Sequence, residues 1–326
     1  MSAIANQTTN EDTALPVTFT ITDVDNTLDC VTSLAAGSSN VALVPVANIV
    51  FSGTAPNCTA TVTPVANASG VTNLTFTVVD TGTPVLNDFK TFSFTVNAVN
   101  DAPTISSISN TTILEDNVAT INFTIADVDN TLNCVTSMSA TSSNTGLVPV
   151  ANIVFSGTAP NCTATVTPVA DGNGSTNLNF TVTDTGTPVQ SASQPFTLTV
   201  TAVNDAPVIT AIANQTINED NSVSVNFTIT DVDSILNCTT SMTSSSSNTS
   251  IIDPSSIVFS GTAPNCSATI NPVLNANGAV NLTFRVTDSG ALFMDQTFTV
   301  TINPVNDAPT ISSISNVTIN EDSTLG

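Results

Sequence analysis

The residues best suited to chemistry in this sequence are acidic, and they recur in four short motifs. The chain carries 25 Asp and Glu residues against two basic ones, Lys90 and Arg285, so its formal net charge is −23. Most of the acids return every 104 residues, in Glu-Asp, Asp-x-Asp, Asp-Thr/Ser-Gly and Asn-Asp-Ala-Pro motifs. Ca²⁺ takes about six to eight oxygen ligands, including carboxylates, amides and backbone carbonyls. The pattern therefore predicts Ca²⁺ binding wherever the fold brings these motifs together.

A proline-containing linker separates the repeats. Val-Asn-Asp-Ala-Pro stands at 99–103, 203–207 and 305–309, each time between two stretches of alternating polar and apolar residues. Proline fixes φ and removes a backbone donor, so these segments are expected to be extended and stiff. We assign repeats to 1–100, 101–204 and 205–306, and the truncated start of a fourth to 307–326. With no leader of its own, the chain is expected to be a section of a longer protein.

Apolar and polar residues alternate within each repeat, which is the period of β-strands and not of helices. Four phenylalanines per repeat, Phe19, Phe51, Phe76 and Phe92 in the first, fall on the apolar phase and are expected to pack in the core. Strands are expected in the first repeat at 4–9, 17–22, 31–34, 48–51, 59–63, 74–78 and 92–96. Seven short strands separated by turn residues predict an all-β fold. It consists of tandem seven-stranded antiparallel Greek-key β-sandwiches, arranged as an extended rod.

Strand direction decides which acidic motifs can meet. The Glu-Asp pair follows the first strand and the Asn-Asp linker follows the last, so both lie at one end of a sandwich. The other two motifs follow the second and sixth strands, and the stiff linker brings that end of the next repeat close. The first junction would gather Glu11 with its neighbour Asp12, Asn100, Asp101, Asp127, Asp129 and Asp184. The second would gather Glu115 with its neighbour Asp116, Asn204, Asp205, Asp231, Asp233 and Asp288. The first repeat has the equivalent positions Asp23, Asp25 and Asp80 at its free end. The third repeat and the linker after it have the equivalent positions Glu219, Asn306 and Asp307.

These acids could instead do no more than cap turns. Turn capping explains any one motif, whereas it does not explain why four motifs converge on one junction. Mg²⁺ fits such a junction less well because it keeps its waters, and Zn²⁺ prefers His or thiolate ligands. Paired carboxylates could also hydrolyse glycosides. Three near-identical copies without His, Trp or Tyr disfavour catalysis, and we expect no enzyme.

Two cysteines per repeat, at one fixed separation, predict a disulfide inside each repeat. Counting strand directions places both cysteines at the same end of the sandwich. The predicted pairs are Cys30–Cys58, Cys134–Cys162 and Cys238–Cys266. Metal or redox use is the alternative, but the chain has no His and no Cys-x-x-Cys motif. An even number of regularly spaced cysteines indicates an oxidising compartment, so we expect an extracellular or cell-surface location.

The order of the motifs resembles that of cadherin repeats. Glu219-Asp-Asn, Asp231-Val-Asp, Val-Thr-Asp288-Ser-Gly and Val-Asn-Asp307-Ala-Pro follow the family order of a Glu, Asp-x-Asp, an Asp and an Asn-Asp-Asn-x-Pro linker. The resemblance covers all three repeats and implies an Ig/cadherin-like sandwich whose junctions bind Ca²⁺ and become rigid. The linker lacks the second Asn, and the acid motif at the end of the fifth strand is absent, so we expect one or two ions per junction. Regular copies with disulfides are similar to the cadherin-like repeats of large microbial adhesins.

These features predict an adhesive or structural segment of a surface protein, with other surface proteins or copies of itself as partners. The alternative is the subunit of a self-assembling filament or sheath, joined when the unpaired strand at 310–325 adds to another sheet. Few basic residues disfavour nucleic acid, and no apolar run is long enough to span a membrane. Glycans are possible at Asn-x-Ser/Thr sequences such as those at Asn6, Asn57, Asn110, Asn161, Asn214, Asn265 and Asn316.

Overall fold

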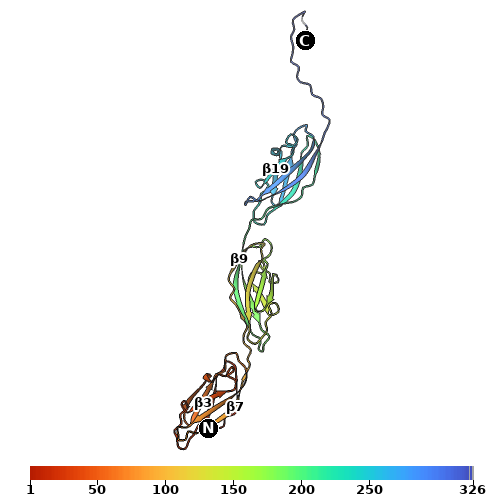
Figure 1. The fold of residues 1–326 in the computed structure, drawn as a ribbon. Coiled ribbons are helices and arrows are strands. Elements are labelled where there is room, and N and C mark those ends of the chain that lie inside the picture. The colour runs from red at the N-terminus through yellow and green to blue at the C-terminus, as the bar shows by residue number, and fades with distance from the viewer. Residues whose placement is uncertain (323, 325–326) are drawn as a thin grey trace. The chain divides into compact units, whose positions relative to one another are not determined.

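The computed structural model describes residues 1–322 and 324, and its regular secondary structure is almost entirely β-strand (Figure 1). It forms two compact units, Met1–Thr201 and the part from Ala202 onward. The first unit holds two β-sandwiches and the second holds one. The predicted boundaries at 100, 204 and 306 remain predictions. In the part of the chain that the structure describes, no helix is long and apolar enough to cross a membrane.

The second sandwich shows the architecture most completely. Its strands are β8 (Thr104–Ile105), β9 (Thr111–Leu114), β10 (Ala119–Ala126), β11 (Met138–Ser142), β12 (Ile153–Thr158), β13 (Asn161–Val166), β14 (Gly174–Thr183) and β15 (Ser191–Thr201). One sheet has the order β12-β13-β10-β8 and the other β11-β14-β15-β9. This Greek-key order of two packed sheets confirms the predicted fold class.

The third sandwich repeats this order, and the first repeats it without a counterpart of β8, so that one of its sheets has three strands. The first contains β1 (Gln7–Asn10), β2 (Leu15–Thr20), β3 (Leu34–Ser38), β4 (Ile49–Thr54), β5 (Asn57–Val62), β6 (Gly70–Val79) and β7 (Asn87–Asn97). The third contains β16 (Val208–Ile209), β17 (Gln215–Asn218), β18 (Val223–Thr230), β19 (Met242–Ser246), β20 (Val258–Thr262), β21 (Asn265–Ile270), β22 (Gly278–Thr287) and β23 (Phe293–Asn303). A short 3-10 turn precedes β4, β12 and β20, at Val46–Asn48, Val150–Asn152 and Pro254–Ser256.

Two local features differ from the sequence prediction. In the second and third repeats the first strand is divided between the two sheets: β8 pairs antiparallel with β10, whereas β9 pairs parallel with β15. The chain crosses from one sheet to the other without reversing, so the second half runs alongside the last strand. The strand predicted at 31–34 instead begins at Leu34. Asp29 Oδ1 accepts hydrogen bonds from the backbone N–H groups of Val31 and Thr32, at 2.8 Å each, and this turn delays the strand.

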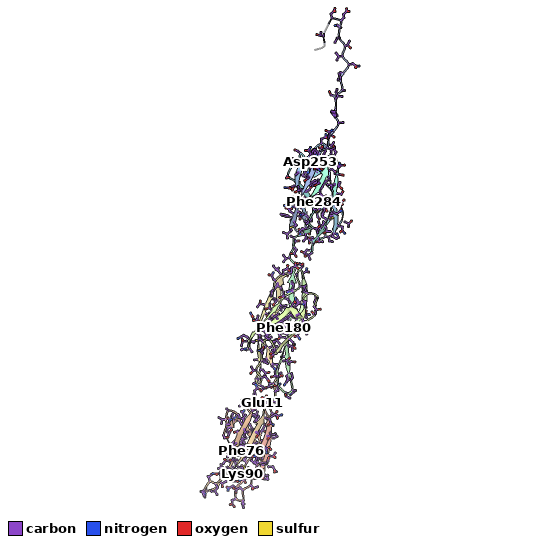
Figure 2. The ribbon with its side chains drawn as sticks, turned by 90° about the vertical axis from the view of Figure 1, so that its right-hand side faces the viewer. Glu11, Phe76, Lys90, Phe180, Asp253 and Phe284 are labelled. Atoms are coloured by element: carbon purple, nitrogen blue, oxygen red, sulfur yellow. A yellow bond between two sulfur atoms is a disulfide. The ribbon has the colours of Figure 1, made fainter. Side chains whose placement is uncertain are left out.

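A phenylalanine cluster fills the centre of each sandwich. In the second sandwich Phe180 is fully buried, and its ring centroid lies 5.0 Å from those of Phe155 and Phe196 and 5.7 Å from that of Phe123. Phe76 and Phe284 occupy the same place in the other two (Figure 2). Edge-to-face and tilted ring contacts of this kind add to the burial of apolar area. The predicted core role of these residues is confirmed.

The three predicted disulfides are present. Cys30–Cys58, Cys134–Cys162 and Cys238–Cys266 each have Cα atoms 5.4 Å apart. In the second sandwich Cys162 lies on β13 opposite Phe123, and Cys134 lies in the connection between β10 and β11. Each bridge therefore joins a loop to the beginning of an inner strand, at the same end of the sandwich.

The described residues after β23 form no strand. Ile311 is 85% exposed and Ile314 is 81% exposed, whereas Ile108, the equivalent of Ile314 in the second repeat, is buried. In the second repeat this segment pairs with β10 and β15, and residues 307–322 have no such sheet to join. Residues 323, 325 and 326 of the predicted fourth repeat lie outside the described residues.

Candidate metal centre

Three carboxylates from distant parts of the first unit converge at the first linker. Glu11 follows β1 and is labelled in Figure 2, Asp101 belongs to the linker, and Asp129 follows β10. One oxygen of each lies within 4.8 Å of the others. Glu11 is only 4% exposed, while Asp129 is exposed. These three belong to the set predicted for this junction. We call them the linker triad.

Backbone hydrogen bonds hold the linker between the triad residues. Glu11 Oε1 accepts a hydrogen bond from the Val99 N–H at 2.6 Å, and Asp129 Oδ2 accepts one from the Asp101 N–H at 2.8 Å. The Glu11 N–H in turn donates to the Asn97 carbonyl at 2.9 Å. The turn between β1 and β2 of the first sandwich (the A–B turn), the linker, and the loop between β10 and β11 of the second (the B–C loop) are therefore tied to one another at a single place.

Asp127 presents a further oxygen. Its Oδ1 closes the B–C turn by accepting hydrogen bonds from the N–H groups of Asp129 and Asn130, at 2.8 and 2.7 Å. Its Oδ2 is buried and has no hydrogen-bond partner. In the second unit Asp231 Oδ2 is likewise buried and has no hydrogen-bond partner. A buried carboxylate oxygen without a donor is costly, and a bound cation would satisfy it.

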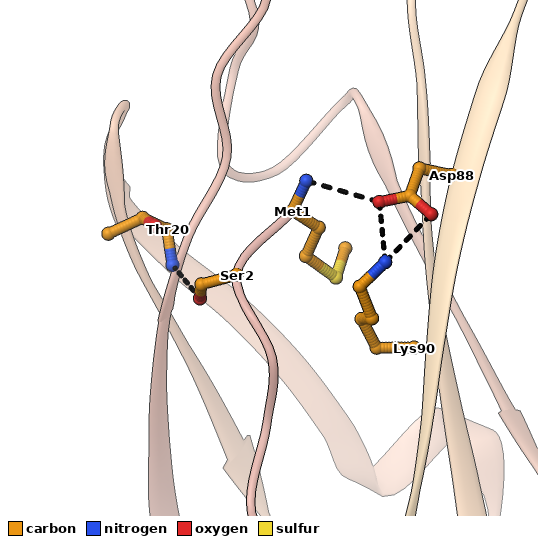
Figure 3. A network of polar contacts seen from close by, with 5 residues as sticks. All are labelled: Met1, Ser2, Thr20, Asp88 and Lys90. Atoms are coloured by element: carbon orange, nitrogen blue, oxygen red, sulfur yellow. Dashed lines mark hydrogen bonds and ion pairs between the residues drawn. The ribbon is translucent and has the colours of Figure 1, made fainter.

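The charges around Asp101 are unbalanced. Desolvation raises the pKa of the Asp101 carboxyl, and the negative charges of Asp129, Asp12 and Asp127 raise it further. The two basic side chains are paired elsewhere. Lys90 binds Asp88 at 2.7 Å beside the Met1 amino group (Figure 3), and Arg285 binds Asp295 at 2.8 Å. The triad thus lacks the protein cation that usually accompanies grouped carboxylates.

Two predicted ligands of this junction have other partners. Asp184 Oδ2 accepts a hydrogen bond from Asn100 Nδ2 at 2.6 Å, and Asp184 Oδ1 accepts one from the Gln190 N–H at 2.8 Å. Burial opposes ionisation of Asp184, but hydrogen bonds from Gln190, Asn100 and Gly186 outweigh it, and its pKa is lowered. Asn204 and Asp288 form the equivalent 2.7 Å bond in the second unit. The sequence analysis did not anticipate this pairing, and metal binding by these residues stays a prediction.

The sequence prediction missed Asn67. Its backbone N–H donates to Asp12 Oδ1 at 3.0 Å, and with its side-chain amide turned so that Nδ2 faces the carboxylates, Nδ2 donates to Asp12 Oδ2 and Asp101 Oδ2, each at 3.3 Å. The same backbone bond joins Asp171 to Asp116 at 3.1 Å and Asn275 to Asp220 at 2.9 Å. All six residues have positive φ, which Asn and Asp tolerate better than other side chains. Recurrence of Asn or Asp every 104 residues was the signal that could have revealed Asn67.

Asp12→Ala is expected to destabilise the first sandwich by about 1–2 kcal/mol, because the acceptor for Asn67 is lost and alanine is strained at a φ of 56°. Hydrogen exchange of the first-sandwich strand amides in the full chain would measure the loss. Asp12→Asn is the control, because asparagine accepts the same bond and tolerates this φ. Equal destabilisation by both variants would show that the Asn67 contact is unimportant.

The remaining predicted ligands occupy the expected turns. In the second unit Asp233 Oδ2 accepts a hydrogen bond from the Asp205 N–H at 2.9 Å, and Glu219 Oε1 accepts one from the Val305 N–H. Glu115 is buried after β9, with its N–H bonded to the Thr201 carbonyl at 3.0 Å. Its sharing of a site with Asp205, Asp231 and Asp233 stays a prediction.

At the two ends of the series the predicted ligands show fewer contacts with one another. Asp23 Oδ1 accepts a hydrogen bond from the Asp25 N–H at 2.8 Å, and Asp80 Oδ1 accepts one from the Leu86 N–H at 2.9 Å. Both bonds close local turns. Asn306 and Asp307 are exposed. Metal binding at these two sets likewise stays a prediction.

Comparison with known proteins gives similarity at the level of solved structures. No protein-family model and no curated protein sequence matches the chain. The chain is similar to protocadherin gamma B2 extracellular cadherin domains 1–5, with 17% identity, 94% of this chain covered and a TM-score of 0.45. The match spans 60% of that protocadherin chain. Mouse cadherin-23 EC22–24 is 13% identical, with 94% of this chain and 97% of that chain covered and a TM-score of 0.41. The human desmocollin-1 ectodomain is 14% identical, with 93% and 61% covered and a TM-score of 0.40.

Proposed function

We propose that this chain is a structural segment of an extracellular surface protein whose linkers become rigid when they bind Ca²⁺. The observation that carries the proposal is the linker triad. Glu11, Asp101 and Asp129 come from three separate parts of the sequence, and their oxygens gather within 4.8 Å. Turn capping accounts for single hydrogen bonds of these residues but does not require their carboxylates to approach one another.

The donor set fits Ca²⁺. All the side-chain atoms that converge are oxygens, the chain contains no His, and every cysteine belongs to a disulfide. Glu11, Asp101 and Asp129 would hold the ion, and Asp127 Oδ2 is the nearby buried oxygen that an ion would satisfy. A bound cation would join the first sandwich, the linker and the second sandwich, and would offset the repulsion that raises the pKa of Asp101.

An extracellular, adhesive role is supported by chemistry outside the linker. Three intra-repeat disulfides require an oxidising compartment. Tandem sandwiches with cadherin-like motif order suit a spacer that presents or joins surface proteins, including other copies of this chain. Asn6 and Asn57 are exposed members of Asn-x-Thr sequences, where glycans could be attached.

Small-angle scattering of the full chain tests this proposal. In 2 mM Ca²⁺, on the order of the affinity range of extracellular Ca²⁺ modules, the maximum dimension should be fixed and the scattering should be that of a rigid particle. Excess EGTA should broaden the distribution of interatomic distances because the repeats then move independently. Mg²⁺ at the same concentration is the control for ionic strength. Identical distributions in Ca²⁺ and EGTA would overturn the proposal.

A further inference from the structure

We propose that an asparagine in each linker fixes the linker to the repeat that follows it, without any metal ion. The contact, which we call the amide lock, is made in the first unit by Asn100, Asn130, Asp184 and Gly186. The lock lies beside the linker triad but uses different atoms. It therefore goes beyond the proposed Ca²⁺ role and holds whether or not Ca²⁺ binds.

Both polar atoms of the Asn100 side chain are engaged. Asn100 Nδ2 donates to Asp184 Oδ2 at 2.6 Å and to the Pro188 carbonyl at 3.0 Å. Asn100 Oδ1 accepts a hydrogen bond from Asn130 Nδ2 at 2.7 Å. Asn130 belongs to the B–C loop of the second sandwich, and Asp184 and Pro188 belong to the loop between β14 and β15 (the F–G loop), so one amide bridges the two loops. Asp184 is only 5% exposed, and hydrogen bonds to a buried carboxylate are among the stronger ones in proteins.

Gly186 provides the space for this amide. A Cβ atom at position 186 would lie 1.6 Å from Asn100 Oδ1 and 2.0 Å from Asn100 Cγ. No side chain can be added there while Asn100 stays in place. Glycine is therefore needed at this turn for close approach of the linker and not for an unusual φ.

The second unit repeats the asparagine–aspartate bond and the glycine, while Ser234 replaces Asn130 and pairs with Ser289 at 2.9 Å. Asn204 Nδ2 donates to Asp288 Oδ2 at 2.7 Å, and a Cβ atom at Gly290 would lie 2.5 Å from Asn204 Oδ1. This linker belongs to the compact unit of the repeat that follows it, which begins at Ala202. The lock thus recurs wherever a described linker enters a sandwich.

The first sandwich shows the same turn without a linker amide. Asp80 Oδ1 still accepts hydrogen bonds from the N–H groups of Gly82 and Leu86, at 3.2 and 2.9 Å. A Cβ atom at Gly82 would lie 3.2 Å from Asn26 Nδ2, at the end of that side chain, and 3.5 Å from Asp80 Oδ2, which is ordinary contact. The F–G turn therefore forms without the lock, and the steric requirement for glycine arises from the linker. Gly82 is a natural control position.

The lock divides the junction into two parts with different chemistry. Asn100 and Asp184 hold the linker to the second sandwich by hydrogen bonds alone. Glu11 holds the first sandwich to the linker by one hydrogen bond from the Val99 N–H, and at the triad its carboxylate faces two others. Removing Ca²⁺ should therefore loosen the triad, while the hydrogen bonds of Asn100 keep the linker attached to the following repeat.

Hydrogen exchange of the full chain in excess EGTA tests the lock. In the unaltered protein, the backbone amides of linker residues 100–102 should exchange at least about tenfold more slowly than in an unstructured peptide. Gly186→Ala should accelerate exchange at this linker roughly ten- to a hundredfold, the range expected for losing hydrogen bonds to a charged group. Exchange at residues 204–206, the second linker of the same molecule, should not change. Gly82→Ala should leave both linkers protected.

Asn100→Ala removes the amide without adding bulk and should accelerate exchange at the first linker as Gly186→Ala does. If Gly186→Ala lowers the protection of the β14 and β15 amides, it perturbs the whole sandwich. In that case the result of Asn100→Ala decides whether the lock exists. Fast exchange at residues 100–102 of the unaltered protein in EGTA would overturn the inference. So would unchanged protection in Asn100→Ala. Neither result would bear on Ca²⁺ binding by the triad, which is measured in the presence of the ion.

Discussion

Glu11→Gln is expected to weaken Ca²⁺ binding at the first linker by at least roughly 100-fold. Loss of a residue that merely orients a metal ligand typically costs about 10–100-fold in affinity, and loss of a direct carboxylate ligand should cost no less. Glutamine has nearly the same shape and keeps an oxygen that can accept the 2.6 Å hydrogen bond from the Val99 N–H. The expected effect therefore reflects the lost charge and not a rearranged turn.

Titration of the ¹⁵N-labelled full chain with Ca²⁺ would measure this loss at the Val99 and Asp101 amide resonances. Glu219→Gln is the matched control, because Glu219 makes the equivalent contact with the Val305 N–H at the end of the third sandwich. The control should leave the first-linker titration unchanged. If Glu11→Gln and the unaltered chain bind with the same affinity, the triad is not the Ca²⁺ site.

Replacing both Cys134 and Cys162 by alanine is expected to lower the unfolding free energy of the second sandwich by about 3.5 kcal/mol. The bridge closes a loop between residues 28 apart in sequence, and most of its effect comes from restricting the unfolded chain. The cysteines lie in a buried region, with exposed fractions of 1% and 2%, so two small cavities would add to the loss.

Urea unfolding of the full chain, followed by hydrogen exchange resolved to each sandwich, would measure this change. The Cys30–Cys58 and Cys238–Cys266 sandwiches of the same molecule serve as internal controls and should keep their stability. Addition of a thiol reductant to the unaltered chain should destabilise all three sandwiches. A stability change below about 1 kcal/mol in the double variant would contradict the loop-closure argument.

Much of the fold could be predicted because the sequence repeats it three times. The positions of Phe76, Phe180 and Phe284 follow from alternation along a strand, since a side chain on the apolar face of a sandwich must enter its core. The disulfide partners follow from strand direction, which places both cysteines of a repeat at one end. The beginning of β3 was not predictable, because the Asp29 turn that delays it depends on one local side-chain hydrogen bond.

For the candidate metal centre, the sequence determined which motifs could meet. These motifs contain recurring Asp, Glu and Asn residues in turns, and counting the strands tells at which end of the sandwich each turn lies. Only the tertiary structure decided which of those residues group their carboxylates and which form hydrogen bonds with an amide. Distances of a few ångström place Glu11, Asp101 and Asp129 together while Asn100 bonds to Asp184. Linear spacing specifies the end of a sandwich at which a residue lies, but not which oxygen faces another carboxylate and which faces an amide. That choice depends on side-chain packing at the linker, including the space that Gly186 leaves for Asn100.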